Sequence, residues 1–244
     1  MTSIRKKRYG AGPALWGGDT LPQGEEKAEA VREMFDTIAP RYDLVNRIMT
    51  FRLDVRWRKR AIHDLELPAG SLVLDLASGT GDMCIDLRAA GHRPISADFS
   101  YGMLAADRSG APRIQADVTR LPVRDGAADG ATCGFALRNF VDLDAFFAEL
   151  GRVLRPGGRI ALLDVDTPNN GVMRWGHGVY FGKVVPRIGG ALSDRSAYSY
   201  LPRSVAYLPP AERMVASLER SGFREVAHVQ LSGGITQLLT ATRD

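Results

Sequence analysis

Residues 71–82 read Ser-Leu-Val-Leu-Asp-Leu-Ala-Ser-Gly-Thr-Gly-Asp. The first six are mostly apolar and predict a short strand, while residues 83–90 have the pattern of a helix. Between them, Gly79 and Gly81 let the backbone approach a ligand closely, and the N–H groups that begin the helix face negative charge. This strand–loop–helix unit predicts the ligand-binding loop of a nucleotide-binding sheet.

Around this unit the chain alternates between strand-like and helix-like segments, which predicts a mainly parallel sheet. The predicted strands cover residues 71–76, 94–97, 113–116, 130–135, 159–165, 225–231 and 235–241. The predicted helices cover residues 83–90, 101–107, 143–154 and 210–221, and Pro156-Gly157-Gly158 is expected to separate a helix from the central strand. The last two strands flank Ser232-Gly233-Gly234 and are expected to pair antiparallel. The predicted fold class is α/β and Rossmann-like, a mainly parallel seven-stranded sheet with one antiparallel strand and helices on both faces.

The remaining segments are expected to surround this sheet. Residues 1–24 are rich in glycine and proline and predict a flexible N-terminal arm. Residues 25–244 are expected to form one domain, which begins with a helix over 25–35 and a helical stretch interrupted near Thr50. Residues 168–207 break the alternation and are expected to form an insertion, or lid, on the substrate side of the sheet.

Composition limits the class of protein. The net charge is +4, and most basic residues are interleaved with acids, so no nucleic-acid partner is predicted. The cluster at 56–60 is expected to be the solvated face of a helix that carries Trp57 inward, with contact to an anionic membrane as the alternative. No apolar run reaches the about 18 residues that span a bilayer, and no secretory signal is evident, which predicts a cytoplasmic protein. Cys84 and Cys133 are expected to be buried thiols, and the four scattered histidines predict no metal site.

The loop departs from the dinucleotide-binding pattern. That pattern needs Gly or Ala three residues after the second glycine, where this chain has Cys84, and no lysine loop for ATP is present. An acid follows each of the next two strands: Asp98, placed to accept from both ribose hydroxyls, and Asp117, placed to accept from an adenine amino group. Each acid alone could be a capping or loop residue. With Asp75 they stand at three successive strand ends, which favours S-adenosylmethionine (SAM) as the cofactor.

Further motifs lie outside the loop. They are residues 34–46 (Met-Phe-Asp-Thr-Ile-Ala-Pro-Arg-Tyr-Asp-Leu-Val-Asn), Trp57-Arg58, Asp98-Phe99-Ser100, Met103-Leu104, residues 135–139 (Phe-Ala-Leu-Arg-Asn), 152–158 (Arg-Val-Leu-Arg-Pro-Gly-Gly), 198–202 (Tyr-Ser-Tyr-Leu-Pro) and 231–235 (Leu-Ser-Gly-Gly-Ile). With the loop, they resemble the ubiquinone/menaquinone biosynthesis C-methyltransferases over roughly residues 28–242. The resemblance implies a class I SAM-dependent methyltransferase that C-methylates a prenylated aromatic ring, demethylmenaquinol or its benzoquinol analogue.

The resemblance also implies where the cofactor is bound. The expected cofactor-binding residues are Asp75, Ala77, Ser78, Gly79, Thr80, Gly81, Asp98, Phe99, Met103, Asp117, Val118 and Gly134. Gly134 stands where the family usually has Ser, so a contact there would use the main chain. Asp54 replaces the usual His before the Trp, and Asp164-Val165-Asp166 replaces Glu-x-Ser. These departures leave another quinone-like or polyketide ring open as the acceptor.

Two side chains are candidates for the chemistry. SAM carries its own leaving group, so the protein must position the ring carbon and stabilise the phenolate as it forms. Arg138 could hold the oxyanion or order a water, and a structural arginine that fixes the insertion is its alternative. Tyr42 would cover the site from the N-terminal helix, with a core aromatic as its alternative. Asp164 and Asp166 could supply the base, although helix or loop capping is favoured for each.

The insertion offers a place for the isoprenoid tail of a membrane-embedded quinol. Apolar side chains between Val172 and Val185 could line a channel, with Arg174, Lys183 and Arg187 at a membrane surface, or the segment could pack as a lid. The enzyme would then be peripheral at the inner face of the cell membrane, without a transmembrane segment, and a homodimer is compatible with the sequence. Two rival functions are a methyltransferase for another small aromatic metabolite and a SAM-fold binding protein that has lost catalysis.

Overall fold

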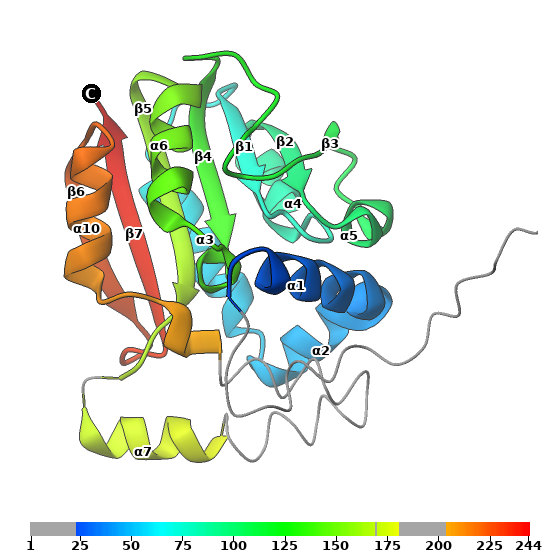
Figure 1. The fold of residues 1–244 in the computed structure, drawn as a ribbon, viewed down its shortest axis with the longest axis vertical. Helices are drawn as coiled ribbons and strands as arrows, with labels where there is room; N and C mark the ends of the chain where they lie inside the picture. Colours follow the sequence, from blue (N-terminus) through cyan, green and yellow to red (C-terminus); the bar gives the residue numbers. More distant parts are fainter. Residues whose placement is uncertain (1–22, 169, 181–203) are drawn as a thin grey trace, which may run out of the picture.

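The computed structural model describes residues 23–168, 170–180 and 204–244. A seven-stranded sheet runs through them in the order β3-β2-β1-β4-β5-β7-β6 (Figure 1). Its strands are β1 (Leu72–Leu76), β2 (Arg93–Asp98), β3 (Arg113–Gln115), β4 (Ala128–Gly134), β5 (Leu154–Val165), β6 (Phe223–Leu231) and β7 (Thr236–Arg243). β1, which leads into the glycine loop, therefore lies beside β4 where the strand order reverses, the usual place for a ligand in such sheets.

Strands β1 to β5 pair in parallel, whereas β7 runs antiparallel to both β5 and β6. The helices are α1 (Gly24–Ile38), η2 (Ala39–Arg41), α2 (Tyr42–Met49), α3 (Leu53–Asp64), α4 (Asp82–Ala89), α5 (Tyr101–Ala106), η3 (Leu137–Asn139), α6 (Leu143–Val153), α7 (Gly171–Val179), η5 (Val205–Tyr207) and α10 (Ala211–Arg220). The predicted fold class, with its single antiparallel strand, is confirmed.

Successive side chains of each strand point to opposite faces of the sheet, and helices cover both faces. Leu74 of β1 and Leu162 of β5 pack with α6 and α10 on one face. Val73 and Leu163, each one residue away, pack with α3 and α4 on the other face. Apolar side chains on both faces explain why these strands read as near-continuous apolar runs in the sequence.

The N-terminal helices lie across the carboxyl ends of the parallel strands (Figure 1). Phe51 and Arg52 have φ of +50° and +63°, so the chain turns sharply between α2 and α3, at the predicted interruption. The Asp36 carboxylate of α1 accepts hydrogen bonds from the Ser100 hydroxyl at 2.5 Å and the Gly102 amide at 2.9 Å. These bonds fix α1 over α5 at the edge of the sheet.

Two expectations about local structure were wrong. Pro156-Gly157-Gly158 lies within the bounds of β5, because α6 already ends at Val153 and pairing with β4 begins at Leu154; Gly157, with φ of +75°, interrupts the extended backbone. The pairing with β4 shifts between Ala128 and Gly130, and this irregularity accommodates the motif within the strand. The cluster at 56–60 is not entirely a solvated face either, since Arg58 is buried beside Trp57.

Several predictions concern segments at the edge of the described structure. Of the predicted arm 1–24, only the last two residues are described, and Gly24 already begins α1. The predicted insertion 168–207 is represented by α7 and η5, while residues 181–203, with the Tyr-Ser-Tyr-Leu-Pro motif, lie outside the described residues. Within the described ranges no helix is long and apolar enough to cross a membrane, and no group of acids, His or Cys could hold a metal ion. Both cysteines are buried thiols.

Candidate active site

Two cavities meet at the loop that follows β1. The first, of about 420 Å³, is the sheet-edge cavity, lined by residues that follow β2 and β3, by η3 and by α1. The second, of about 480 Å³, is the helix-side cavity, lined by α2, α3, the glycine loop and α7. The residues common to both walls are Tyr42, Ala77, Gly79, Gly134 and Phe135. The loop and the end of β4 therefore form the boundary between two chambers.

The loop takes its shape from residues in the left-handed region. Ala77, Gly79 and Gly81 have φ of +51°, +57° and +85°. A Cβ at Gly81 would lie 2.7 Å from Asp107 Cγ and 2.9 Å from Ser109 Cβ, so only glycine fits. Gly81 is the N-cap residue of α4 and does not line either cavity.

Asp98 ends β2 and points at the loop from the neighbouring strand. Its Oδ2 accepts from the Gly79 amide and its Oδ1 from the Ser100 amide, each at 2.8 Å. Each carboxylate oxygen can accept a second hydrogen, and the residue lines the sheet-edge cavity. Burial raises the pKa of the Asp98 carboxyl to about 6, although these backbone hydrogen bonds oppose the shift.

The other residues expected around an adenosine also line the sheet-edge cavity. Phe99 is half exposed, whereas Met103 and Val118 are buried in its wall. Asp117 is exposed, and its Oδ1 accepts from the backbone amide and the hydroxyl of Thr119, both at 2.8 Å. The predicted residues after β2 and β3 are thus brought together in one cavity.

Asp75 is placed differently from the other two acids. It is the penultimate residue of β1 and is 1% exposed, beneath the loop. The Thr132 hydroxyl donates to it at 3.0 Å and the Cys84 thiol at 3.4 Å. Burial raises the pKa of Asp75 to about 7. Its carboxyl supports the loop from below and lines the helix-side cavity.

The remaining loop side chains point toward neighbouring elements. Ser78 and Ser96 share a hydrogen bond of 2.7 Å between their hydroxyls. The Thr80 hydroxyl donates to Asp43 of α2, and Asp43 also pairs with Arg108. Thr80 therefore anchors α2 to the loop. The sequence predicted only that Thr80 contacts the cofactor.

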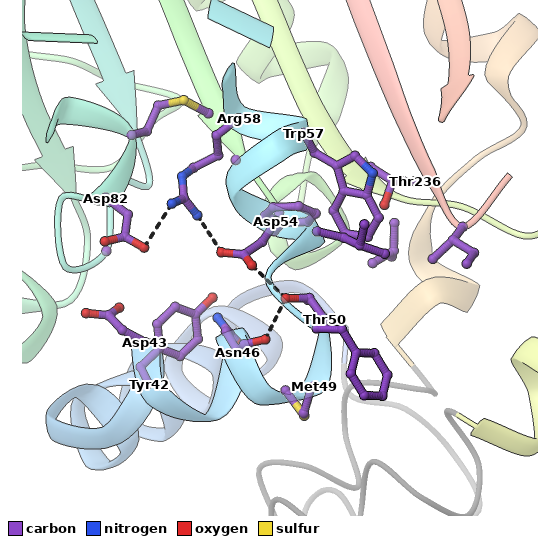
Figure 2. Close-up of a pocket in the computed structure, with 18 of the residues that line it drawn as sticks. Tyr42, Asp43, Asn46, Met49, Thr50, Asp54, Trp57, Arg58, Asp82 and Thr236 are labelled. Atoms are coloured by element: carbon purple, nitrogen blue, oxygen red, sulfur yellow. Dashed lines mark hydrogen bonds and ion pairs between the residues drawn. The ribbon is translucent and has the colours of Figure 1, made fainter. Parts of the chain in front are cut away.

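A charged cluster lies along one side of the helix-side cavity, and three of its members, Asp54, Arg58 and Asp82, line the wall (Figure 2). Arg58 of α3 pairs with Asp54 at 2.7 Å, Asp86 at 2.9 Å and Asp82 at 3.3 Å. Arg47 of α2 pairs with Asp82 at 2.9 Å. These pairs hold α2 and α3 against the first turn of α4, beside the loop.

The opposite wall of this cavity is apolar and aromatic. Trp57 and Phe135 lie with ring centroids 6.0 Å apart, and the Trp57 indole N–H donates to the Ser232 hydroxyl at 2.9 Å. Phe51 and Tyr180 are tilted rings 5.9 Å apart. The other apolar lining side chains are Met49, Leu53, Met83, Val165, Met173 and Ile235. A flat hydrophobic ring fits between such walls.

Both catalytic candidates line the helix-side cavity. Arg138 is buried and pairs with Asp164, while its Nη1 donates to the Phe135 carbonyl at 2.6 Å and its Nε to the Ser204 hydroxyl at 3.1 Å. These bonds match the structural alternative, in which the arginine fixes the start of the segment at 204. Burial raises the pKa of Tyr42, opposed by the charge of Arg138, so its hydroxyl is a donor.

The two acids considered as bases are committed elsewhere. Asp164 is fully buried, pairs with Arg138 and accepts from the Val165 amide at 2.7 Å. Asp166 accepts from the Gln230 amide group at 2.7 Å and does not line either cavity. Their capping and pairing roles are the ones that the structure favours.

Sequence reasoning did not assign the side-chain contacts that hold the N-terminal helices around the site. The residues that make them are Asp36, Asp43, Asp54, Arg58 and Asp82. Most belong to the 34–46 and 57–58 motifs, which contributed to the resemblance without any assigned role. The signal was charge at helical spacing: Asp54 and Arg58 are four residues apart on one face.

Comparisons with known proteins agree with this geometry. A solved SAM-dependent methyltransferase of Thermotoga maritima, described as a possible histamine N-methyltransferase, has a similar fold, with a TM-score of 0.63 at 18% identity over 87% of this chain and 99% of that one. The model of the ubiE/COQ5 methyltransferase family matches residues 23–243. The demethylmenaquinone methyltransferase of Thermus thermophilus is 42% identical over 86% of this chain and 100% of its own length. The ubiquinone/menaquinone biosynthesis C-methyltransferase UbiE of Syntrophotalea carbinolica is 38% identical over 87% and 93%.

The fold and the loop define a class I methyltransferase. The chain belongs to the ubiE/COQ5 methyltransferase family, and its methyl donor is SAM. The residues present fit this cofactor, because Asp98 offers two acceptor oxygens at the sheet-edge cavity and Gly79, without a side chain, leaves the loop backbone accessible from both cavities. The predicted family, enzyme class and cofactor are confirmed.

Proposed function

We propose that the chain transfers a methyl group from SAM to a ring carbon of a prenylated quinol, converting demethylmenaquinol to menaquinol. The observation that carries this proposal is the helix-side cavity, whose aromatic walls adjoin the sheet-edge cavity at Tyr42, Ala77 and Gly134. A volume of about 480 Å³ suits a bicyclic ring with the start of its tail. The printed names of the relatives support the same acceptor.

In this proposal, each part of SAM lies beside residues that can bind it. Asp98 accepts from the ribose hydroxyls, Asp117 from the adenine amino group, and Phe99, Met103 and Val118 enclose the adenine. The methionine part lies along Ala77, Ser78 and Gly79, supported by Asp75, Thr80 and Gly81. The transferable methyl then faces Gly134, which has no side chain to obstruct it.

The chain's residues act by holding the acceptor. SAM supplies an electrophilic methyl group. Loss of a ring hydroxyl's proton to solvent would make the adjacent carbon nucleophilic, so that this carbon could take the methyl group and then release its own C–H proton to solvent. Tyr42 donates to the ring oxygen and so stabilises the developing phenolate, while Arg138, paired with Asp164, positions the cavity wall beside it.

We further propose that the enzyme takes its acceptor from the surface of a membrane. Residues 25–244 form the catalytic domain, with 168–207 as a lid for the isoprenoid tail. Phe51 lines the helix-side cavity and is 74% exposed, and Trp175 of α7 is 73% exposed. With the exposed Arg52 and Arg56, they suit a peripheral contact with an anionic membrane. Flotation with anionic vesicles is the test, and no association at low salt would contradict it.

The second candidate is a methyltransferase for another small aromatic acceptor, favoured by Asp54 in the cavity wall. A labelled-SAM assay with demethylmenaquinol, a demethylated benzoquinol and a panel of soluble phenols separates the two. We expect label on a ring carbon of demethylmenaquinol. Transfer to soluble phenols alone would contradict the proposed acceptor.

A further inference from the structure

Asp54 lies in the first turn of α3 and lines the helix-side cavity, 4% exposed (Figure 2). Its Oδ2 accepts from Arg58 Nη1 at 2.7 Å, and its Oδ1 accepts from the Thr50 hydroxyl at 2.6 Å. Trp57, one helical turn further on, belongs to the aromatic wall. Asp54 therefore places a carboxylate beside the space that a planar acceptor ring would occupy.

The pair with Arg58 makes Asp54 an acceptor. An ion-paired carboxylate carries no proton to donate, and each oxygen accepts more than one hydrogen. Arg58 remains neutralised without Asp54, because Asp86 and Asp82 also pair with it. Asp54 can therefore be changed without leaving the Arg58 cation unpaired.

The other acids that line this cavity have different partners on the loop side. Asp43 is engaged by Thr80 and Arg108, Asp75 by Thr132 and Cys84, and Asp82 by the two arginines. Asp54 instead comes from the helix that carries Trp57 and is bonded to Thr50, next to Phe51. Among the described acids that line this cavity, Asp54 is the closest in sequence to Phe51 and Trp57, which belong to its aromatic wall.

We infer that Asp54 makes the site selective for the reduced form of its acceptor, an inference that rests on the proposed function. A quinol hydroxyl donates a hydrogen bond to the carboxylate, whereas a quinone oxygen has no hydrogen to give and is repelled by the negative charge. Methyl transfer needs the electron-rich quinol. Asp54 therefore excludes the oxidised ring, which would otherwise occupy the cavity unproductively.

Asp54→Asn reverses this polarity with little disturbance. The amide oxygen would accept from Arg58 and the amide nitrogen would donate to Thr50 Oγ1, whose own hydrogen would then turn to the Asn46 carbonyl, 2.8 Å away. Because Asp54 lines the cavity, the second amide hydrogen would then be available there as a donor. Asp86→Asn is the matched control, because it removes a carboxylate from the same arginine but does not line the cavity.

The experiment is an anaerobic calorimetric titration of 1,4-naphthoquinol and 1,4-naphthoquinone into protein loaded with S-adenosylhomocysteine. We expect the wild type to bind the quinol about 10- to 100-fold more tightly than the quinone, the range of one hydrogen bond to a charged group. Asp54→Asn should reduce that ratio about tenfold or more, and Asp86→Asn should change it less than about threefold. Thermal unfolding of each variant verifies that it is folded.

The outcomes separate this inference from the proposed function. An unchanged ratio in Asp54→Asn, or an equal change in Asp86→Asn, would overturn the role of Asp54 while leaving the acceptor class intact. If the folded wild type bound neither naphthalene ring, the proposed acceptor would fall and this inference with it.

Discussion

The two cavities beside the glycine loop are built by different means. The sheet-edge cavity is formed by residues at the ends of parallel strands, such as Asp98, whose carboxylate is held by two backbone amides. The helix-side cavity is formed by α2, α3 and α7, and ion pairs of Arg47 and Arg58 attach α2 and α3 to Asp82 beside the loop. The difference indicates that the cofactor half is fixed by sheet register and the acceptor half by helix packing. Each variant below should affect one half more than the other.

The largest effect is expected on the helix side. Arg58→Met would leave the buried Asp54 and the half-buried Asp86 without a cation, and Asp82 with Arg47 alone, which should cost about 4 kcal/mol in the free energy of unfolding. Arg60→Met, on the same helix with its exposed pair to Asp64, should cost less than about 0.5 kcal/mol. Urea unfolding measures both, and equal costs would show that the buried cluster does not hold the helices.

The loop itself should tolerate no side chain at Gly81. Gly81→Ala combines a positive φ with close contacts to Asp107 and Ser109, and should cost about 3 kcal/mol. Gly70→Ala has a similar φ of +87° with open space around it, and should cost about 1 kcal/mol. The difference between the two midpoints in urea measures the crowding, and a difference near zero would contradict it.

On the sheet side, Asp98→Asn should weaken SAM binding about 100-fold, because hydrogen bonds to a charged acceptor are lost. Asp117→Asn should weaken it by less than about tenfold, since Asp117 is exposed. Calorimetric titration of SAM measures both constants. Neither variant should change naphthoquinol affinity more than about threefold, and parallel losses for both ligands would erase the distinction between the cavities.

On SAM affinity, pH should have a smaller effect than Asp98→Asn. The pKa of Asp98 is raised to about 6, and the ionised form accepts from the ribose. SAM affinity should therefore be nearly full above about pH 7 and fall about tenfold between pH 7 and pH 5, with no such fall in Asp98→Asn.

The pH dependence of folding stability has the opposite sign to that of SAM affinity. Because burial raises the pKa of Asp75 to about 7, the stability it contributes to the ligand-free protein is present below pH about 4 and lost as pH rises through 7. Asp75→Asn should flatten that part of the stability profile, as measured by urea unfolding across pH. An unchanged profile would contradict the assignment.

The sequence predicted the sheet-edge cavity because strand ends can be read from a pattern. Parallel strands place their last residues at one edge, so Asp98 and Asp117 could be assigned to one site without knowing the register. The helix-side cavity had no such rule. Arg58 was expected in solvent because its neighbours are basic, and only the packing of α3 on α4 showed that three acids surround it. The Pro-Gly-Gly motif was misplaced because a bulge in β5 accommodates it.

One measurement tests the division between the two cavities most directly. It is the titration of 1,4-naphthoquinol into the protein with and without saturating S-adenosylhomocysteine, under anaerobic conditions. Separate cavities that meet at Ala77 and Gly134 predict that both ligands bind together, with quinol affinity unchanged or increased by the cofactor product. Competition between the two ligands, seen as a loss of quinol binding at saturation, would contradict the account.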